Sequence, residues 1–134
     1  MSIASSGNKI VEQSVLNGLC EMDNPSKMIN IIDRLNKLDI IREEYCKKHN
    51  IRREGLSVLL RLMKSWIVDN EGMTIYQLAG GRISHHTSFY NLVVSLQGKG
   101  LIEVSGVSKQ RARVYIPSVV TIRELSAMII AKDL

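Results

Sequence analysis

The apolar pattern of this chain changes its period at the segment Gly98-Lys99-Gly100. Before that segment, apolar residues recur at spacings of three and four, as on one face of a helix: Phe89, Leu92, Val93 and Leu96. After it, Leu101–Val104 is a short run with β-branched residues, and Arg111–Ile116 alternates polar and apolar side chains through its second half. The pattern predicts a helix that ends near Gln97 and is followed by a hairpin with its loop at residues 106–110.

A short helix and a glycine turn precede this helix. Thr74 is a suitable N-cap for a helix at Ile75–Ala79, and Gly80-Gly81 supplies the turn that follows it. Ser84 is the expected cap of the helix that ends near Gln97. The order short helix, turn, polar helix and hairpin is the plan of a winged helix-turn-helix.

Caps and apolar spacings predict further helices on both sides of this segment. Asn24 and Pro25 are the expected cap and first residue of a long amphipathic helix, because proline fits the first helical turn. Three other helices are expected: residues 9–22, residues 56 to 70 after a break at Arg52–Gly55, and a last one within residues 119–133.

The composition supports a single folded domain. With 134 residues, 45% hydrophobic, the chain is long enough to bury a core without disulfides or a metal. The expected fold class is mainly α with a small β-hairpin, a winged helix-turn-helix flanked by N- and C-terminal dimerisation helices. Its parts are a disordered start at 1–7, N-terminal helices at 8–48, the winged helix-turn-helix at 56–116 and the last helix at 119–133.

The positive charge of the chain is concentrated in one segment. The net charge is +5, and residues 82–116 hold five basic residues against one acidic residue. Basic residues clustered in this way are typical of a nucleic-acid partner, because neutralising phosphates releases counterions. A solvated basic face without a partner is the alternative interpretation.

The motifs of this segment resemble those of the MarR family of bacterial transcriptional regulators. The similar stretches are the Thr-led short helix of residues 73–79, the Ser/Thr-rich helix of residues 83–93 and the phrase Leu96-Gln97-Gly98-Lys99-Gly100-Leu101-Ile102. The resemblance covers roughly Leu56–Ile116. It implies a homodimeric transcriptional repressor that binds double-stranded DNA.

The hairpin and the C-terminus depart from the family pattern. Members usually carry an Asp-x-Arg at the tip of the wing, whereas this wing reads Ser108-Lys109-Gln110-Arg111-Ala112-Arg113 and has no Asp. Arg111 is the closest counterpart of the family arginine. The C-terminal helix is also short, so the N-terminal helices are expected to carry most of the dimer contacts.

The candidate DNA contacts lie on the polar face of the predicted recognition helix and on the wing. Hydroxyl, amide and imidazole groups suit base edges and phosphates, and basic groups suit phosphates. The candidates are Ser84, His85, His86, Thr87, Ser88, Tyr90, Asn91, Lys109, Arg111 and Arg113. For the helix the alternative is an ordinary polar surface, and Tyr90 has the alternative of packing on the scaffold.

The long N-terminal helix carries a wider apolar stripe than one neighbour covers, which predicts a second subunit. The dimerisation candidates are Met28, Ile31, Leu35 and Leu38, with Ile122, Leu125 and Ile129 of the last helix. A small molecule held between the dimer helices and the winged domain is a candidate effector in this interpretation.

The sequence gives no sign of catalysis, a cofactor or a membrane anchor. No phosphate loop or nucleophile elbow is present, so no enzyme is expected. His85-His86 with Cys46 and His49 lack the spacing of a metal site, and Cys20 and Cys46 are expected to be reduced thiols. Apolar runs such as Met128–Ala131 are too short to span a bilayer, and no secretory signal is visible, so a cytoplasmic protein is expected.

Two functions from different classes therefore remain open. The first is a homodimeric DNA-binding regulator. The second is a winged-helix protein-interaction module or an accessory DNA-binding protein of a mobile element, without a ligand response. The basic wing and the polar start of the helix favour the first, whereas the short C-terminal helix and the altered wing leave room for the second.

Overall fold

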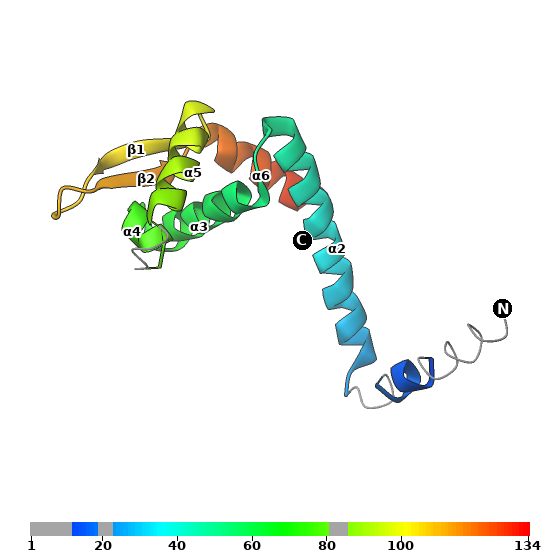
Figure 1. The fold of residues 1–134 in the computed structure, drawn as a ribbon. Helices are drawn as coiled ribbons and strands as arrows, with labels where there is room; N and C mark the ends of the chain where they lie inside the picture. Colours follow the sequence, from blue (N-terminus) through cyan, green and yellow to red (C-terminus); the bar gives the residue numbers. More distant parts are fainter. Residues whose placement is uncertain (1–11, 19–22, 81–85) are drawn as a thin grey trace, which may run out of the picture. The chain divides into compact units, whose positions relative to one another are not determined.

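A computed structural model describes residues 12–18, 23–80 and 86–134 of the chain (Figure 1). The chain divides into two compact units, residues 1–36 and 37–134, and we describe each by itself. The described part is mainly helical with one small antiparallel hairpin, which confirms the coarse expectation of a mainly α fold with a small β-hairpin. The elements are α2 (Pro25–His49), α3 (Arg53–Asp69), α4 (Ile75–Leu78), α5 (His86–Gly98), β1 (Ile102–Val107), β2 (Arg113–Pro117) and α6 (Val119–Ala131).

The N-terminal unit contains a short helix at residues 12–18 and the first half of α2. The predicted cap of α2 is confirmed, because the Asn24 side-chain oxygen accepts a hydrogen bond from the backbone N–H of Lys27 at 3.1 Å and Pro25 begins the helix. The helix ends at His49, close to the predicted Lys48.

Helix α3 begins earlier than the sequence pattern predicts. The expected break at Arg52–Gly55 is wrong, because the helix starts at Arg53 and includes Gly55. Gly55 lies against α5, where a Cβ would stand 3.4 Å from Leu96. Gly55 is therefore a buried residue inside the helix and not a helix stop. The predicted end is confirmed, since Asn70 follows α3 in the left-handed conformation with φ 54°.

The core of residues 37–134 is formed by one side of each helix and by the hairpin. Leu59 and Leu62 of α3 are fully buried, together with Val93 and Leu96 of α5. Tyr45, Leu101, Tyr115 and Leu125 complete the centre of this core. Each buried leucine contributes about 1.5–3 kcal/mol to folding, so these helices are held by packing more than by helix propensity.

The last helix is joined to the hairpin through buried hydroxyl groups. Ser118 caps α6 by accepting the N–H of Thr121, and the Thr121 hydroxyl donates to the Leu101 carbonyl at 2.7 Å. Leu125 is completely buried in the core of its own chain, and Ile122 and Ile129 are half-buried. In this structure Leu125, expected at a dimer interface, has no surface to offer a second subunit.

The end of α2 is tied to α6 by an acidic residue. Glu124 Oε2 forms an ion pair with the Lys48 ammonium and accepts a hydrogen bond from His49 Nε2 at 3.1 Å. The His49 ring also lies against Tyr45, with ring centroids 4.5 Å apart. The hydrogen bond from Lys48, together with that from His49, holds the pKa of Glu124 below its ordinary value of 4.5, although burial opposes this.

We expect Glu124→Gln to lower the free energy of unfolding by about 1 kcal/mol at pH 7. Because the pKa of Glu124 is depressed in the folded state, its contribution is fully present above the ordinary value of 4.5 and is lost as pH falls through the folded value. Urea unfolding at pH 7 and pH 3 measures the difference, which should shrink at pH 3. Glu103→Gln, on the exposed part of β1, is the matched control and should behave like the parent at both pH values.

Candidate nucleic-acid interface

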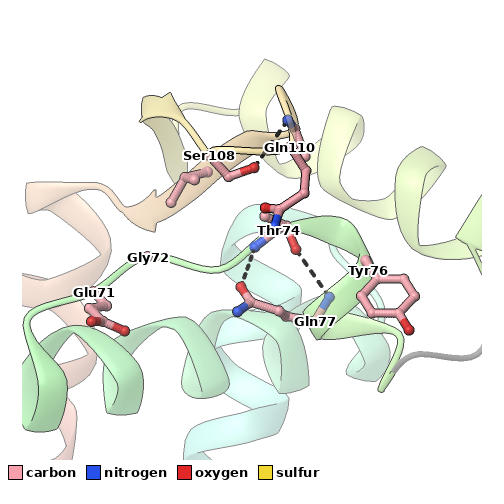
Figure 2. Close-up of a pocket in the computed structure, with 9 residues that line it drawn as sticks. Glu71, Gly72, Thr74, Tyr76, Gln77, Ser108 and Gln110 are labelled. Atoms are coloured by element: carbon pink, nitrogen blue, oxygen red, sulfur yellow. Dashed lines mark hydrogen bonds between the residues drawn. The ribbon is translucent and has the colours of Figure 1, made fainter.

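The short helix α4 is held by a reciprocal cap. The Thr74 hydroxyl accepts the Gln77 backbone N–H at 3.2 Å, and the Gln77 side-chain oxygen accepts the Thr74 backbone N–H at 2.9 Å, as Figure 2 shows. This capping box satisfies two N–H groups at the start of a helix that is only one turn long. The predicted Thr74 cap is confirmed.

The other end of α4 is fixed by an arginine that the sequence pattern does not reveal. Arg61 of α3 donates from Nη1 to the Leu78 carbonyl at 2.6 Å, which satisfies a carbonyl at the end of α4. Leu78 and Ala79 are buried, and Gly80 follows with φ 66°. The sequence predictions for Gly81, Ser84 and His85 lie outside the described residues.

Helix α5 presents the expected polar face. Val93 and Leu96 are fully buried and Phe89 and Leu92 are half-buried, which confirms the predicted helical phase. Thr87, Ser88 and Asn91 are exposed. Tyr90 is 48% exposed, so its ring lies at the surface and not in the core. His86 is the first residue of the helix, and its side chain is outside the described part of the structure.

The first strand of the hairpin is longer than predicted, and the turn, at residues 108–112, lies two residues later than the expected loop. Strand β1 continues through Gly106 to Val107, and β2 begins at Arg113, so the expected loop at residues 106–110 is wrong. The turn closes through Ser108, whose carbonyl accepts the Arg111 N–H at 2.9 Å and whose hydroxyl accepts the Ala112 N–H at 3.2 Å. These bonds place the reversal of the chain at residues 108–112, two residues later than the loop predicted to start at Gly106.

Arg111 lies in this turn and not in the second strand, which corrects the predicted strand Arg111–Ile116. Its φ is 63°, a left-handed conformation that disfavours residues with a Cβ. The side chain is exposed, as are those of Lys109 and Arg113. Within the described residues, none of these three basic side chains forms an ion pair. The turn, which projects away from the helices (Figure 1), is therefore a solvated cluster of positive charge.

The base of the hairpin is fastened to the segment before α4. The backbone of Met73 exchanges two hydrogen bonds with that of Tyr115, at 2.9 and 2.8 Å. An open hollow of about 630 Å³ lies between the hairpin turn and α4, and Figure 2 shows side chains from both sides of it: Thr74, Tyr76, Gln77, Ser108 and Gln110. The backbone bridge between Met73 and Tyr115 sets the position of the hairpin relative to α4.

A second hollow, which no sequence motif predicts, lies beside α5. It has a volume of about 580 Å³, and Ser88 and Asn91 share it with Arg52 and Lys99. The Lys99 ammonium also donates to the His49 carbonyl at 3.2 Å. The residues come from two segments, residues 50–54 and 88–99, so no single motif could have indicated this arrangement.

The predicted dimerisation stripe on α2 is exposed. Met28, Ile31 and Leu38 are 39–40% exposed and Leu35 is 55% exposed, and the neighbouring Ile29, Ile32 and Ile40 are exposed as well. On this helix only Ile41 and Tyr45 are buried. An apolar stripe of this length open to water is typical of an interaction surface.

No metal site is formed among the described residues by three or more His, Cys, Asp or Glu side chains. His49 is paired with Glu124, and the half-buried Cys46 has its pKa raised by burial, although Arg42 and Arg53 act in the opposite direction. No described helix has the length and apolar character needed to cross a membrane.

Comparisons of the chain with models of known protein families, with curated proteins and with solved structures found no significant match. The resemblance to MarR regulators therefore depends on the motifs of the sequence alone.

Proposed function

We propose that the chain is a DNA-binding transcriptional regulator of the winged helix-turn-helix class, similar to MarR proteins and acting as a repressor. The observation that carries the proposal is the exposed basic cluster of Lys109 and Arg111 in the hairpin turn and Arg113 at the start of β2, on a hairpin that packs beside the polar-faced helix α5. In this function α4 and α5 form the helix-turn-helix, and α5 enters the major groove.

The wing and the helix have different tasks in this proposal. The wing cations contact phosphates, which positions the protein and supplies affinity that depends on salt. The exposed Thr87, Ser88 and Asn91 face the base edges and the adjoining backbone. Binding over a promoter then blocks transcription by occupying the DNA.

The same proposal includes a homodimer assembled through α2. Its support is the exposed stripe of Met28, Ile31, Leu35 and Leu38, which is apolar over more than two helical turns. Two copies related by a two-fold axis would bind half-sites about one helical turn of DNA apart.

Leu35→Glu should convert this dimer into a monomer, because a charge would be buried in the apolar interface. Light scattering at tens of micromolar protein without DNA measures the mass. Ile67→Glu is the matched control, since Ile67 is a 68% exposed apolar residue that belongs to α3 and not to the α2 stripe, and this variant should keep the parent's mass. A monomeric parent would contradict the assembly.

Fluorescence anisotropy with labelled duplex DNA at several salt concentrations tests the function itself. The affinity should fall steeply as salt rises, and selection from randomised duplexes should recover a preferred sequence. Absence of duplex binding at 50 mM salt would contradict the proposed function.

A further inference from the structure

The outward face of α5 carries no formal charge. The helix His86–Gly98 contains no Lys, Arg, Asp or Glu. Thr87, Asn91 and Val94 follow each other at spacings of four and three residues, so they form one line on the helix surface, which we call the outward stripe. All three are exposed and lie on the side away from the buried Leu96. The stripe presents a hydroxyl, an amide and an aliphatic group to its surroundings.

Val94 is available for an external contact. It is 46% exposed, whereas its neighbour Val93 is completely buried. Because valine is stiff about its single side-chain torsion in a helix, its methyl groups point in a defined direction. Val94 lies one turn from Asn91, so an amide and an aliphatic group are offered side by side.

These groups match the major-groove edge of A·T base pairs. Asn pairs bidentately with adenine, and an apolar side chain contacts the thymine methyl group. The residues that read guanine bidentately are Arg and Lys, and α5 has neither. We propose that the outward stripe recognises A·T base pairs, with Val94 covering a thymine methyl. This inference rests on the proposed function, in which α5 occupies the major groove.

The arginines of the wing also suit DNA that is rich in A·T base pairs. A·T tracts have a narrow minor groove with enhanced negative potential, which attracts arginine. The exposed Arg111 and Arg113 would flank the helix with the cations that such DNA favours.

The test compares two versions of a duplex selected from randomised DNA, one with thymine and one with uracil, which lacks only the methyl group. The proteins are the parent, Val94→Ala and Val68→Ala, a control on α3 whose valine is 68% exposed. The parent and Val68→Ala should bind the uracil duplex more weakly than the thymine duplex, by about four-fold for each thymine methyl that Val94 covers. Val94→Ala should bind both duplexes equally.

Two results would overturn the inference and leave the proposed function intact. One is a selected half-site dominated by G·C pairs. The other is equal binding of the thymine and uracil duplexes by a parent that still binds its selected site with strong salt dependence. If the parent binds no duplex at all, the proposed function fails, and the inference fails with it.

Discussion

Replacing Lys109, Arg111 and Arg113 by Gln, Gly and Gln is expected to weaken duplex binding about 500-fold at 0.1 M salt. Each phosphate contact raises the affinity at 0.1 M salt about eight-fold relative to about 1 M salt. The reason is that, for each contact, log affinity changes by about 0.9 for a tenfold change in salt concentration. The plot of log affinity against log salt concentration should become less steep by about 2.7, which is about 0.9 for each of the three lost phosphate contacts. Glycine is chosen at Arg111 because the residue has φ 63°, so the change removes a charge and relieves backbone strain.

A control with the same change in net charge isolates the wing. Lys64→Gln, Arg123→Gln and Lys132→Gln, combined in one chain, remove three charges from α3 and the α6 region and should leave the salt slope unchanged. The thermal midpoint of both variants should stay close to that of the parent. An equal loss of affinity in the two variants would mean that total charge, and not the wing, determines binding.

The parts of the site that the sequence predicts are those held by local interactions. The Thr74 cap of α4 is predicted from the sequence because its partner, the Gln77 backbone N–H, is only three positions away. The phase of α5 follows from apolar residues that the same helix buries, such as Val93 and Leu96. Such features need no knowledge of the rest of the fold.

The parts that sequence reasoning missed depend on distant neighbours. Arg61 and the Leu78 carbonyl are 17 positions apart, and His49 and Glu124 are 75 positions apart. The break expected at Gly55 is instead a helix contact with Leu96 on another element. Alternation in the second half of Arg111–Ile116 predicts a strand that starts at Arg111, whereas hydrogen bonds to Ser108 close the turn around Arg111. Periodicity alone contains no information about these partners.

Gly72→Ala should lower the free energy of unfolding by about 2–4 kcal/mol, the largest stability effect that we expect from a single methyl group in this chain. A Cβ at this position would stand 2.5 Å from the Tyr115 carbonyl oxygen and 2.6 Å from Val114 Cγ1. The obstacle includes strand backbone, which cannot turn aside as a flexible side chain does. To make room, the chain must move away from β2, and the two hydrogen bonds between Met73 and Tyr115 lie next to the clash.

Gly98→Ala is the matched control for this prediction, because a Cβ at the end of α5 meets nothing within 4 Å. Alanine also has the higher helix propensity, so this variant should be as stable as the parent or slightly more stable. Urea unfolding of the three proteins measures the difference. Since the Met73 bridge fastens the hairpin to the segment before α4, Gly72→Ala should also weaken duplex binding at temperatures where the chain is still folded. If Gly72→Ala and Gly98→Ala were equally stable, the hairpin would not be held against residues 72–73 as described, and the wing would lack the support that the proposed DNA contact requires.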